Sequence, residues 1–168
     1  FHRTIRTIHK PIAREGMSIP KVYEQSFVNI VRATGGRNKD RNLIVQGPHA
    51  DMDCTEKYYG EMPKDIVPNR LMMEVHCYTP WNFCGMKQDE SWGKSYYFWG
   101  KKYHKENSDR NSEWGEEEDI QRMFQKMKTI FIDKGVPVIL GEYGAIRREE
   151  LENDKDNLEQ HLKSRAYY

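Results

Sequence analysis

The sequence has few of the residues and patterns that mark specialised classes of protein. Its 168 residues contain three cysteines, Cys54, Cys77 and Cys84, and no two of them have the CxxC spacing of a zinc or redox site. An odd and sparse set also argues against a disulfide framework, so ordinary thiols are the simpler interpretation. No apolar run approaches the length of a membrane-spanning helix. The basic first residues are not followed by the apolar stretch of a signal peptide.

An excess of charge of one sign is also missing, since 27 Lys and Arg residues face 26 Asp and Glu residues. Without a basic excess, we expect neither nucleic acid nor an acidic membrane surface as a partner. The mean hydropathy is low, −0.94, yet aromatic residues reach 12%. Such an aromatic content argues against disorder, and the length suffices for one domain with a hydrophobic core.

Short apolar runs alternate with amphipathic stretches along most of the chain. We expect strands at residues 42–47, 71–78 and 136–142, helices at 20–34 and 116–134, a short helix near 53–59, and a last helix that carries Leu158, Leu162 and Ala166. No hairpin turn joins the strands, so the order predicts βαβ units and a parallel sheet. Residues 1–19 are expected to be irregular, and His2 and His9 there lack metal-ligand partners at suitable spacing.

Two of the expected helices have apolar stripes at three- and four-residue steps, which indicates one buried side for each. The stripes are Val22, Tyr23, Phe27, Ile30 and Val31 in the first helix, and Ile120, Met123, Phe124, Met127, Ile130 and Phe131 in the second. The second helix begins with four acidic residues, 116–119. Acidic side chains are favourable at the positive end of a helix dipole, which is a simpler interpretation than a metal site.

One strand ends in a carboxylate. Residues 138–140 are Val-Ile-Leu, which predicts a strand covered on both faces, and Glu142 follows between two glycines. At the carboxyl end of a barrel strand, a glutamate in this position can be a catalytic group. A glutamate that points into solvent or caps a neighbouring helix is the alternative, and this stretch alone favours neither.

The preceding strand ends in two polar rings. His76 and Tyr78 are two residues apart and therefore lie on the same side of the strand. Each could be a packed, hydrogen-bonded core residue. Next to a strand that ends in Glu142, however, an imidazole and a phenol can orient a carboxylate and set its protonation.

Residues 79–115, the aromatic segment, form a long connection that is rich in large rings. The rings are Trp81, Phe83, Trp92, Tyr96, Tyr97, Phe98, Trp99, Tyr103 and Trp114. Long loops after barrel strands commonly carry function, and exposed rings suit the flat faces of sugars. The alternative is that half or more of these rings pack the segment onto the domain, as we expect for Phe98 and Trp99.

Together these motifs resemble glycoside hydrolase family 5, and in particular its bacterial branch of endoglucanases and xyloglucanases from rumen and clostridial organisms. The resemblance rests on residues 74–83, EVHCYTPWNF, and 136–145, VPVILGEYGA. Residues 31–36, 42–47, 91–94 and 97–100 support it, and it runs from about residue 20 to residue 168. It implies an α/β fold, a partial (β/α)8 TIM barrel in which the three strands are the fifth, sixth and seventh.

The resemblance also implies roles for individual residues. Glu142 falls on the nucleophile, His76 and Tyr78 on its catalytic neighbours, and Trp81 and Trp92 on substrate-binding positions, with no metal and no cofactor. The family's acid/base is a glutamate that follows an asparagine at the end of strand four, and no Asn-Glu pair precedes residue 20. The chain is therefore expected to carry only the nucleophile half of the site and to be inactive alone.

The implied activity is retaining, endo-acting hydrolysis of β-1,4-glucans such as cellulose, mixed-linkage glucan or xyloglucan. The expected partner is the polysaccharide, and the expected location is outside the cell. Two other classes stay open: a non-catalytic carbohydrate-binding module and a structural half-barrel. Whatever the function, a three-stranded piece leaves its sheet edges unpaired, which would favour association with a complementary barrel fragment or with a second copy.

Overall fold

The computed structural model describes residues 18–168, with side chains from Lys21 onward. Of the residues expected to be irregular, 1–19, the first 17 with the two histidines lie outside this range, whereas Ser18 and Ile19 are helical, so that part of the expectation is wrong. The described chain forms two compact units. The first unit extends to Val75 and also includes Lys126–Ile139, and the second comprises His76–Gln125 and Leu140–Tyr168.

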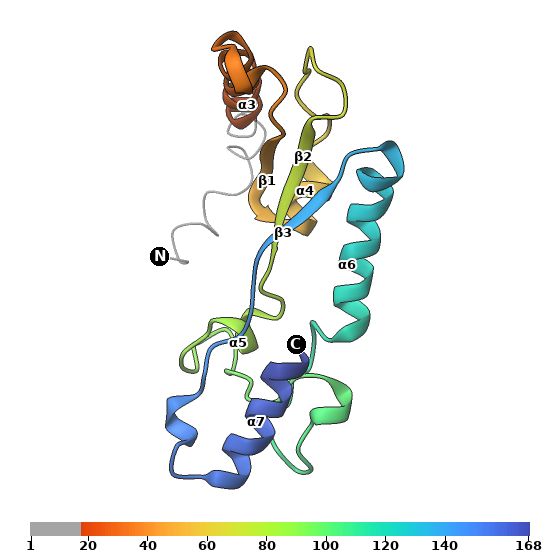
Figure 1. Cartoon of the computed structure of the whole chain (residues 1–168). Coiled ribbons are helices and arrows are strands. Elements are labelled where there is room, and N and C mark those ends of the chain that lie inside the picture. Colours follow the sequence, from red (N-terminus) through yellow and green to blue (C-terminus); the bar gives the residue numbers. More distant parts are fainter. Residues whose placement is uncertain (1–17) are drawn as a thin grey trace. The chain divides into compact units, whose positions relative to one another are not determined.

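Strands and helices alternate along the described chain. Their order is α3 (Ser18–Ala33), β1 (Leu43–Asp51), α4 (Met52–Tyr58), β2 (Leu71–Cys77), α5 (Trp81–Cys84), α6 (Glu117–Ile130), β3 (Val138–Tyr143) and α7 (Lys155–Tyr167), as labelled in Figure 1. The strands form a parallel three-stranded sheet in the order β1-β2-β3. The predicted strands and helices are therefore all present, and the βαβ order is confirmed.

Helix α3 buries a different side from the one its apolar stripe predicts. Val28 is 1% exposed, whereas Tyr23 and Ile30 of the stripe are 70% and 64% exposed. On the buried side, Arg32 makes a bidentate ion pair with Asp65, with nitrogen–oxygen distances of 2.9 and 2.6 Å. A buried charge needs such a partner, so this pair fixes which side of the helix faces inward.

Strand β1 continues beyond its expected end at residue 47. It runs through Pro48 to Asp51, and it lies at the edge of the sheet. An edge strand tolerates proline because the missing N–H can face away from the neighbouring strand. Within β1, Gly47 lies so close to helix α4 that a Cβ atom would come 1.9 Å from Thr55 Oγ1.

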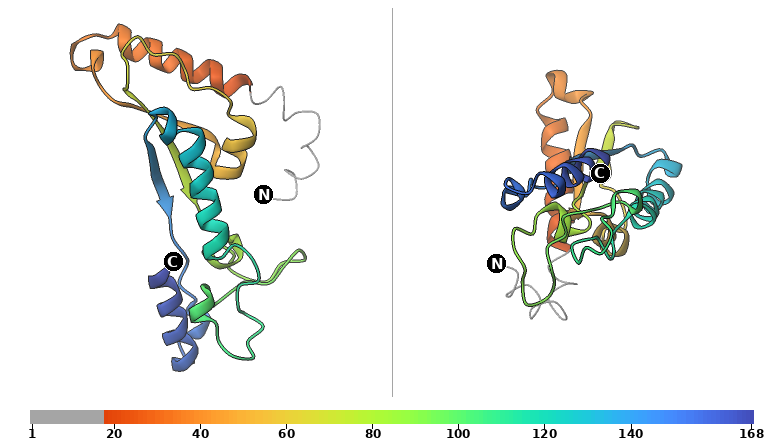
Figure 2. Two further views of the ribbon diagram at one scale, coloured as in Figure 1. Left: turned by 90° about the vertical axis from the view of Figure 1, so that its right-hand side faces the viewer. Right: turned by 90° about the horizontal axis from the view of Figure 1, so that it is seen from below.

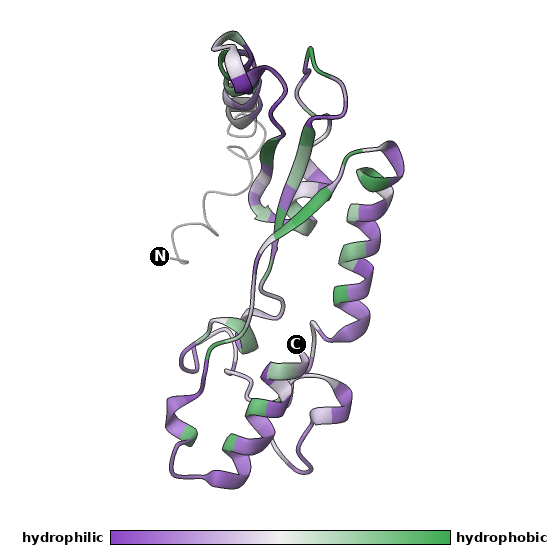
Figure 3. Cartoon of the chain, viewed as in Figure 1, coloured by the Kyte–Doolittle hydropathy of each residue, from purple (hydrophilic) through white to green (hydrophobic). Residues whose placement is uncertain are grey.

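The predicted helix 116–134 is shorter than expected. Helix α6 ends at Ile130, and a 3-10 turn, Ile132–Lys134, leads to Gly135 in a left-handed conformation with φ of 83°. The apolar residues of α6 gather on one side (Figure 3), and Met123 and Met127 are buried there. Phe124, expected on that side, is instead exposed.

Strand β3 is less covered than its apolar run predicts. Val138, Ile139 and Leu140 are only partly buried, because β3 is the other edge of the sheet. In the second unit, the hydrophobic core contains Phe83, Cys84, Tyr96 and Trp99, with Ile120, Ala145 and Tyr168 packed against it. None of the described helices is both long and apolar enough to cross a membrane.

Helix α7 packs beside the segment that follows α5 (Figure 2). The Trp99 amide donates a hydrogen bond to Ser164 Oγ at 3.2 Å. The buried residues of α7 are polar, His161 and Ser164, whereas the expected apolar residues Leu162 and Ala166 are exposed. Hydrogen bonds of His161 and Ser164, together with the ring contact of Tyr167 with Trp99, therefore hold this helix in place.

Candidate active site

The ends of β2 and β3 bring three polar side chains together in the second unit. Glu142 Oε2 lies 3.3 Å from the Tyr78 hydroxyl and 3.3 Å from His76 Nδ1. His76 and Tyr78 share one side of their chain because strand residues alternate, and β3 runs parallel to β2, so its end meets theirs. The three residues that the sequence singled out, which we call the strand-end cluster, therefore form one group.

The protonation of Tyr78 suits this arrangement. Burial of its ring and the adjacent Glu142 carboxylate raise the pKa of Tyr78, so the phenol stays protonated and donates its hydrogen bond to Glu142. The side chain of Glu142 is 56% exposed and that of His76 is 19% exposed. The carboxylate is thus held by two polar rings and is still accessible to a molecule from solution.

Trp81 lies directly beside this cluster. Its ring meets the Tyr78 ring edge to face, with centroids 6.4 Å apart and an interplanar angle of 82°. The indole covers Gly85, where a Cβ atom would come within 2.2 Å of the ring. Trp81 is nevertheless 42% exposed, so it offers an aromatic surface next to the carboxylate.

Two further tryptophans of the aromatic segment are exposed. Trp92 sits on a tight turn closed by hydrogen bonds between Glu90 and Gly93, and its side chain is 48% exposed. Trp114, which the sequence did not single out as a site residue, precedes Gly115. A Cβ atom at Gly115 would come 2.8 Å from Pro80, which precedes Trp81. The aromatic content of the segment was the only signal for Trp114.

Most other rings of the aromatic segment pack inward. Phe83, Tyr96, Phe98 and Trp99 are buried, which confirms the expectation for Phe98 and Trp99. The segment therefore contributes rings both to the core and to the surface. Of its indoles, that of Trp99 is buried, and those of Trp81, Trp92 and Trp114 are exposed.

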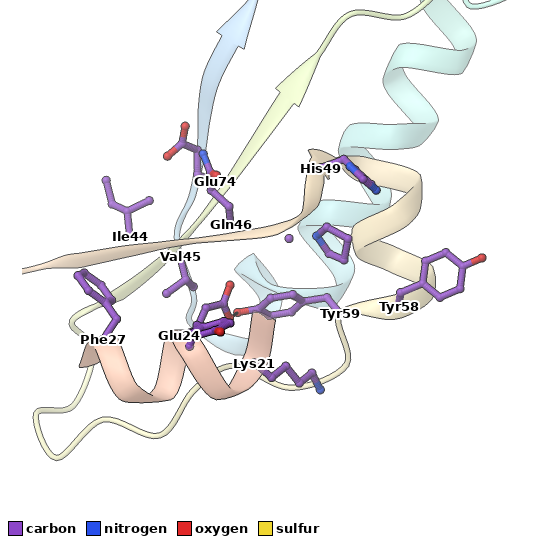
Figure 4. A pocket seen from close by; sticks show the side chains of 13 residues that line it. Lys21, Glu24, Phe27, Ile44, Val45, Gln46, His49, Tyr58, Tyr59 and Glu74 are labelled. Atoms are coloured by element: carbon purple, nitrogen blue, oxygen red, sulfur yellow. Dashed lines mark hydrogen bonds between the residues drawn. The ribbon is translucent and has the colours of Figure 1, made fainter. Parts of the chain in front are cut away.

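A pocket of the described residues lies elsewhere, in the first unit. This cavity of about 570 Å³ is lined by residues of α3, β1 and α4 (Figure 4). On its wall the Tyr59 hydroxyl donates a hydrogen bond to Glu24 at 2.7 Å. The cavity shares no residue with the strand-end cluster. Within residues 21–168, no three His, Cys, Asp or Glu side chains are grouped to hold a metal ion.

The described chain thus has a parallel β/α sheet with a strand-end carboxylate in contact with an imidazole and a phenol, and with an exposed indole beside them. The family model for Cellulase, glycosyl hydrolase family 5, matches residues 15–167. The chain belongs to this family. Structures of the family are (β/α)8 barrels, and the three-stranded sheet here is part of such a barrel.

Relatives of known activity agree with this family. The chain is 40% identical over 154 residues to the xyloglucan-specific endo-β-1,4-glucanase BoGH5A of Bacteroides ovatus, covering 92% of this chain and 29% of that protein. It is 32% identical over 146 residues to endoglucanase A of Paenibacillus barcinonensis, covering 80% and 34% of the two chains. The chain thus spans about a third of the length of the curated relatives it matches.

Solved structures give the same result. A Bacteroides ovatus family 5 xyloglucanase in complex with a XXXG heptasaccharide has a TM-score of 0.83 and 38% identity, over 96% of this chain and 33% of that one. The xyloglucan-specific β-1,4-glucanase XEG5B from a ruminal metagenomic library, in complex with XXLG, has a TM-score of 0.74 and 37% identity. That match covers 92% of this chain and 38% of XEG5B.

Proposed function

We propose that the protein hydrolyses internal β-1,4 bonds of β-glucans with retention of configuration, and that Glu142 is the nucleophile. The observation that carries this proposal is the contact of Glu142 Oε2 with both Tyr78 and His76 at 3.3 Å. Two polar rings on one carboxylate oxygen fix its direction, while the exposed side chain stays open to substrate. The endoglucanase and xyloglucanase relatives support the substrate class.

In the proposed reaction, the Glu142 carboxylate attacks the anomeric carbon and forms a glycosyl-enzyme ester. The C–O bond to the leaving sugar breaks, and a second carboxyl group gives its proton to the departing oxygen. That group then takes a proton from water, which attacks the anomeric carbon and releases Glu142. Tyr78 and His76 keep the nucleophile aimed during both steps. We propose that this chain supplies the nucleophile half, with the second carboxyl contributed by another part of the barrel.

Trp81 would bind the sugar chain beside the nucleophile. An indole stacks on the apolar face of a pyranose, and Trp81 is exposed and touches Tyr78. Trp92 would bind sugar further along the aromatic segment. The relatives in complex with XXXG and XXLG support xyloglucan among the substrates. Because such polymers do not cross membranes, we also propose that the protein acts outside the cell.

A nucleophile assignment predicts a specific rescue. In the intact gene product that carries this chain, Glu142→Ala should lower kcat on xyloglucan by at least about a thousandfold. With an activated dinitrophenyl β-cellobioside, azide should restore turnover: its nitrogen bonds to the anomeric carbon as dinitrophenolate leaves with the bonding electrons. The product should be the α-glycosyl azide, because one displacement inverts the configuration.

Glu149→Ala is the matched control, since Glu149 is an exposed glutamate of the same unit and should leave kcat unchanged. Normal hydrolysis by Glu142→Ala would rule out the assignment. A β-glycosyl azide would instead identify Glu142 as the acid/base. Glucan binding without any hydrolysis by the wild-type protein would favour the carbohydrate-binding alternative.

A further inference from the structure

Arg148 is a fully buried cation whose hydrogen bonds go to the backbone of the aromatic segment. Its guanidinium donates to the carbonyl oxygens of Met86 at 2.6 Å, Asn82 at 2.8 Å and Tyr96 at 2.9 Å. The guanidinium carbon also lies 5.2 Å above the centre of the Tyr97 ring. The Arg148 side chain thus links Asn82 of α5 to Met86 and Tyr96, which follow α5 in the chain.

The backbone of Arg148 is held as firmly as its side chain. Its amide donates a hydrogen bond to His161 Nε2 at 3.1 Å. Since Nε2 accepts, the imidazole proton sits on Nδ1, which donates to the Tyr97 carbonyl at 2.7 Å. Burial lowers the pKa of His161, which agrees with this neutral ring.

Arg148 follows Glu142 by six residues, on the chain that leaves β3. The same stretch makes a second link, because the Ile146 amide donates to the Cys84 carbonyl at 3.0 Å. Residues 146–148 are thereby bonded to two residues of α5, Asn82 and Cys84, and this short helix begins with Trp81. The chain that leaves the nucleophile and the helix that carries the indole therefore form one hydrogen-bonded unit.

We propose that Arg148 is a positioning residue that sets Trp81 relative to Glu142, and so tunes sugar binding beside the nucleophile. This inference rests on the proposed function. Burying a guanidinium is costly, and an apolar side chain of similar volume would commonly stabilise the fold as well or better. An apolar residue, however, cannot hydrogen-bond the three backbone carbonyl groups that converge on the Arg148 guanidinium. The planar set of five donors of arginine can do so.

The test is a double-mutant cycle in the intact gene product, with Arg148→Lys and Trp81→Ala. Lysine keeps the charge but lacks the planar fork, so α5 should shift. Because a displacement of about 1 Å can cost up to about a hundredfold, Arg148→Lys should lower kcat/KM on xyloglucan at least about tenfold, mainly through KM. In the Trp81→Ala background, the same change should cost less than about twofold, since the residue it positions is gone.

Arg147→Lys is the matched control, because Arg147 is the exposed neighbour and pairs with Glu152 at the surface. It should leave kcat/KM unchanged in both backgrounds. Equal losses from Arg148→Lys in the two backgrounds would overturn the inference. So would loss of the fold in both Arg148→Lys and Arg148→Gln, because that result shows a purely structural role.

The cycle can also be followed without hydrolysis. In the Glu142→Gln protein, the dissociation constant of a xyloglucan heptasaccharide should rise about tenfold with Arg148→Lys, and should change little if Trp81 is already alanine. Failure of the proposed function would appear as absent hydrolysis by the wild-type protein. Failure of this inference would appear as additive effects on binding, whatever the hydrolytic activity.

Discussion

Removing the Tyr78 hydroxyl tests whether the strand-end cluster orients Glu142, the proposed nucleophile. A hydrogen bond to a charged group contributes about 1.5 to 3 kcal/mol. The oxygen–oxygen distance of 3.3 Å is longer than usual, so we take the lower value of about 1.5 kcal/mol. Tyr78→Phe in the intact gene product should then lower kcat about tenfold, because each 1.36 kcal/mol changes a rate by about a factor of ten.

The loss should stay far below that of replacing Glu142, since His76 Nδ1 still contacts the same carboxylate oxygen. The assay is the initial rate of reducing-end release from xyloglucan at saturating substrate. The matched control is Tyr143→Phe: Tyr143 follows Glu142, is 65% exposed and points to the other face of β3 by strand alternation. A Tyr78→Phe enzyme within twofold of the wild-type kcat would refute the aiming role.

Two further predictions concern stability. Asp65→Ala leaves Arg32 buried without its partner and should lower the free energy of unfolding by about 3 kcal/mol. Asp109→Ala, at the exposed pair with Lys94, should lower it by less than about 1 kcal/mol. Denaturant titration measures both changes, and equal losses would show that burial of the Arg32 pair does not matter. Because burial lowers the pKa of His161, the unfolded chain binds a proton at this residue more readily than the folded chain does. The free energy of unfolding is therefore unaffected by protonation of His161 above a pH of about 6.5, and it declines as the pH falls from there toward the folded-state pKa. The melting temperature of the wild type should therefore drop between about pH 7 and pH 5 more than that of His161→Gln, and parallel curves would show that His161 does not contribute.

The order of strands and helices could be predicted because it depends on patterns of residues that are neighbours in sequence. Apolar runs and helical periodicity each involve neighbours in sequence, and a two-residue spacing places His76 and Tyr78 on one side. The meeting of Glu142 with these residues also follows from sequence, since parallel strands end at the same edge of a sheet. Their catalytic roles stay a prediction.

Contacts between distant residues could not be predicted in the same way. The buried side of α3 depends on an ion pair between residues 33 positions apart, Arg32 and Asp65, and the exposed stripe gave the opposite answer. Arg148 bonds to backbone carbonyls, whose directions no side-chain pattern reveals. In the sequence, nothing distinguishes Arg148 from its exposed neighbour Arg147, since both stand in the charged stretch 147–150.

The close approach of Gly115 to Pro80 restricts how the region near Trp81 can be engineered. A methyl group at position 115 would collide with the ring and backbone nitrogen of Pro80 at 2.8 to 2.9 Å, and φ of 72° disfavours any other residue there. Mutant libraries of this region should keep this glycine and vary its neighbours Glu113 and Trp114, which are exposed. Such variation would change the exposed surface near Trp81 without introducing a side chain that collides with Pro80.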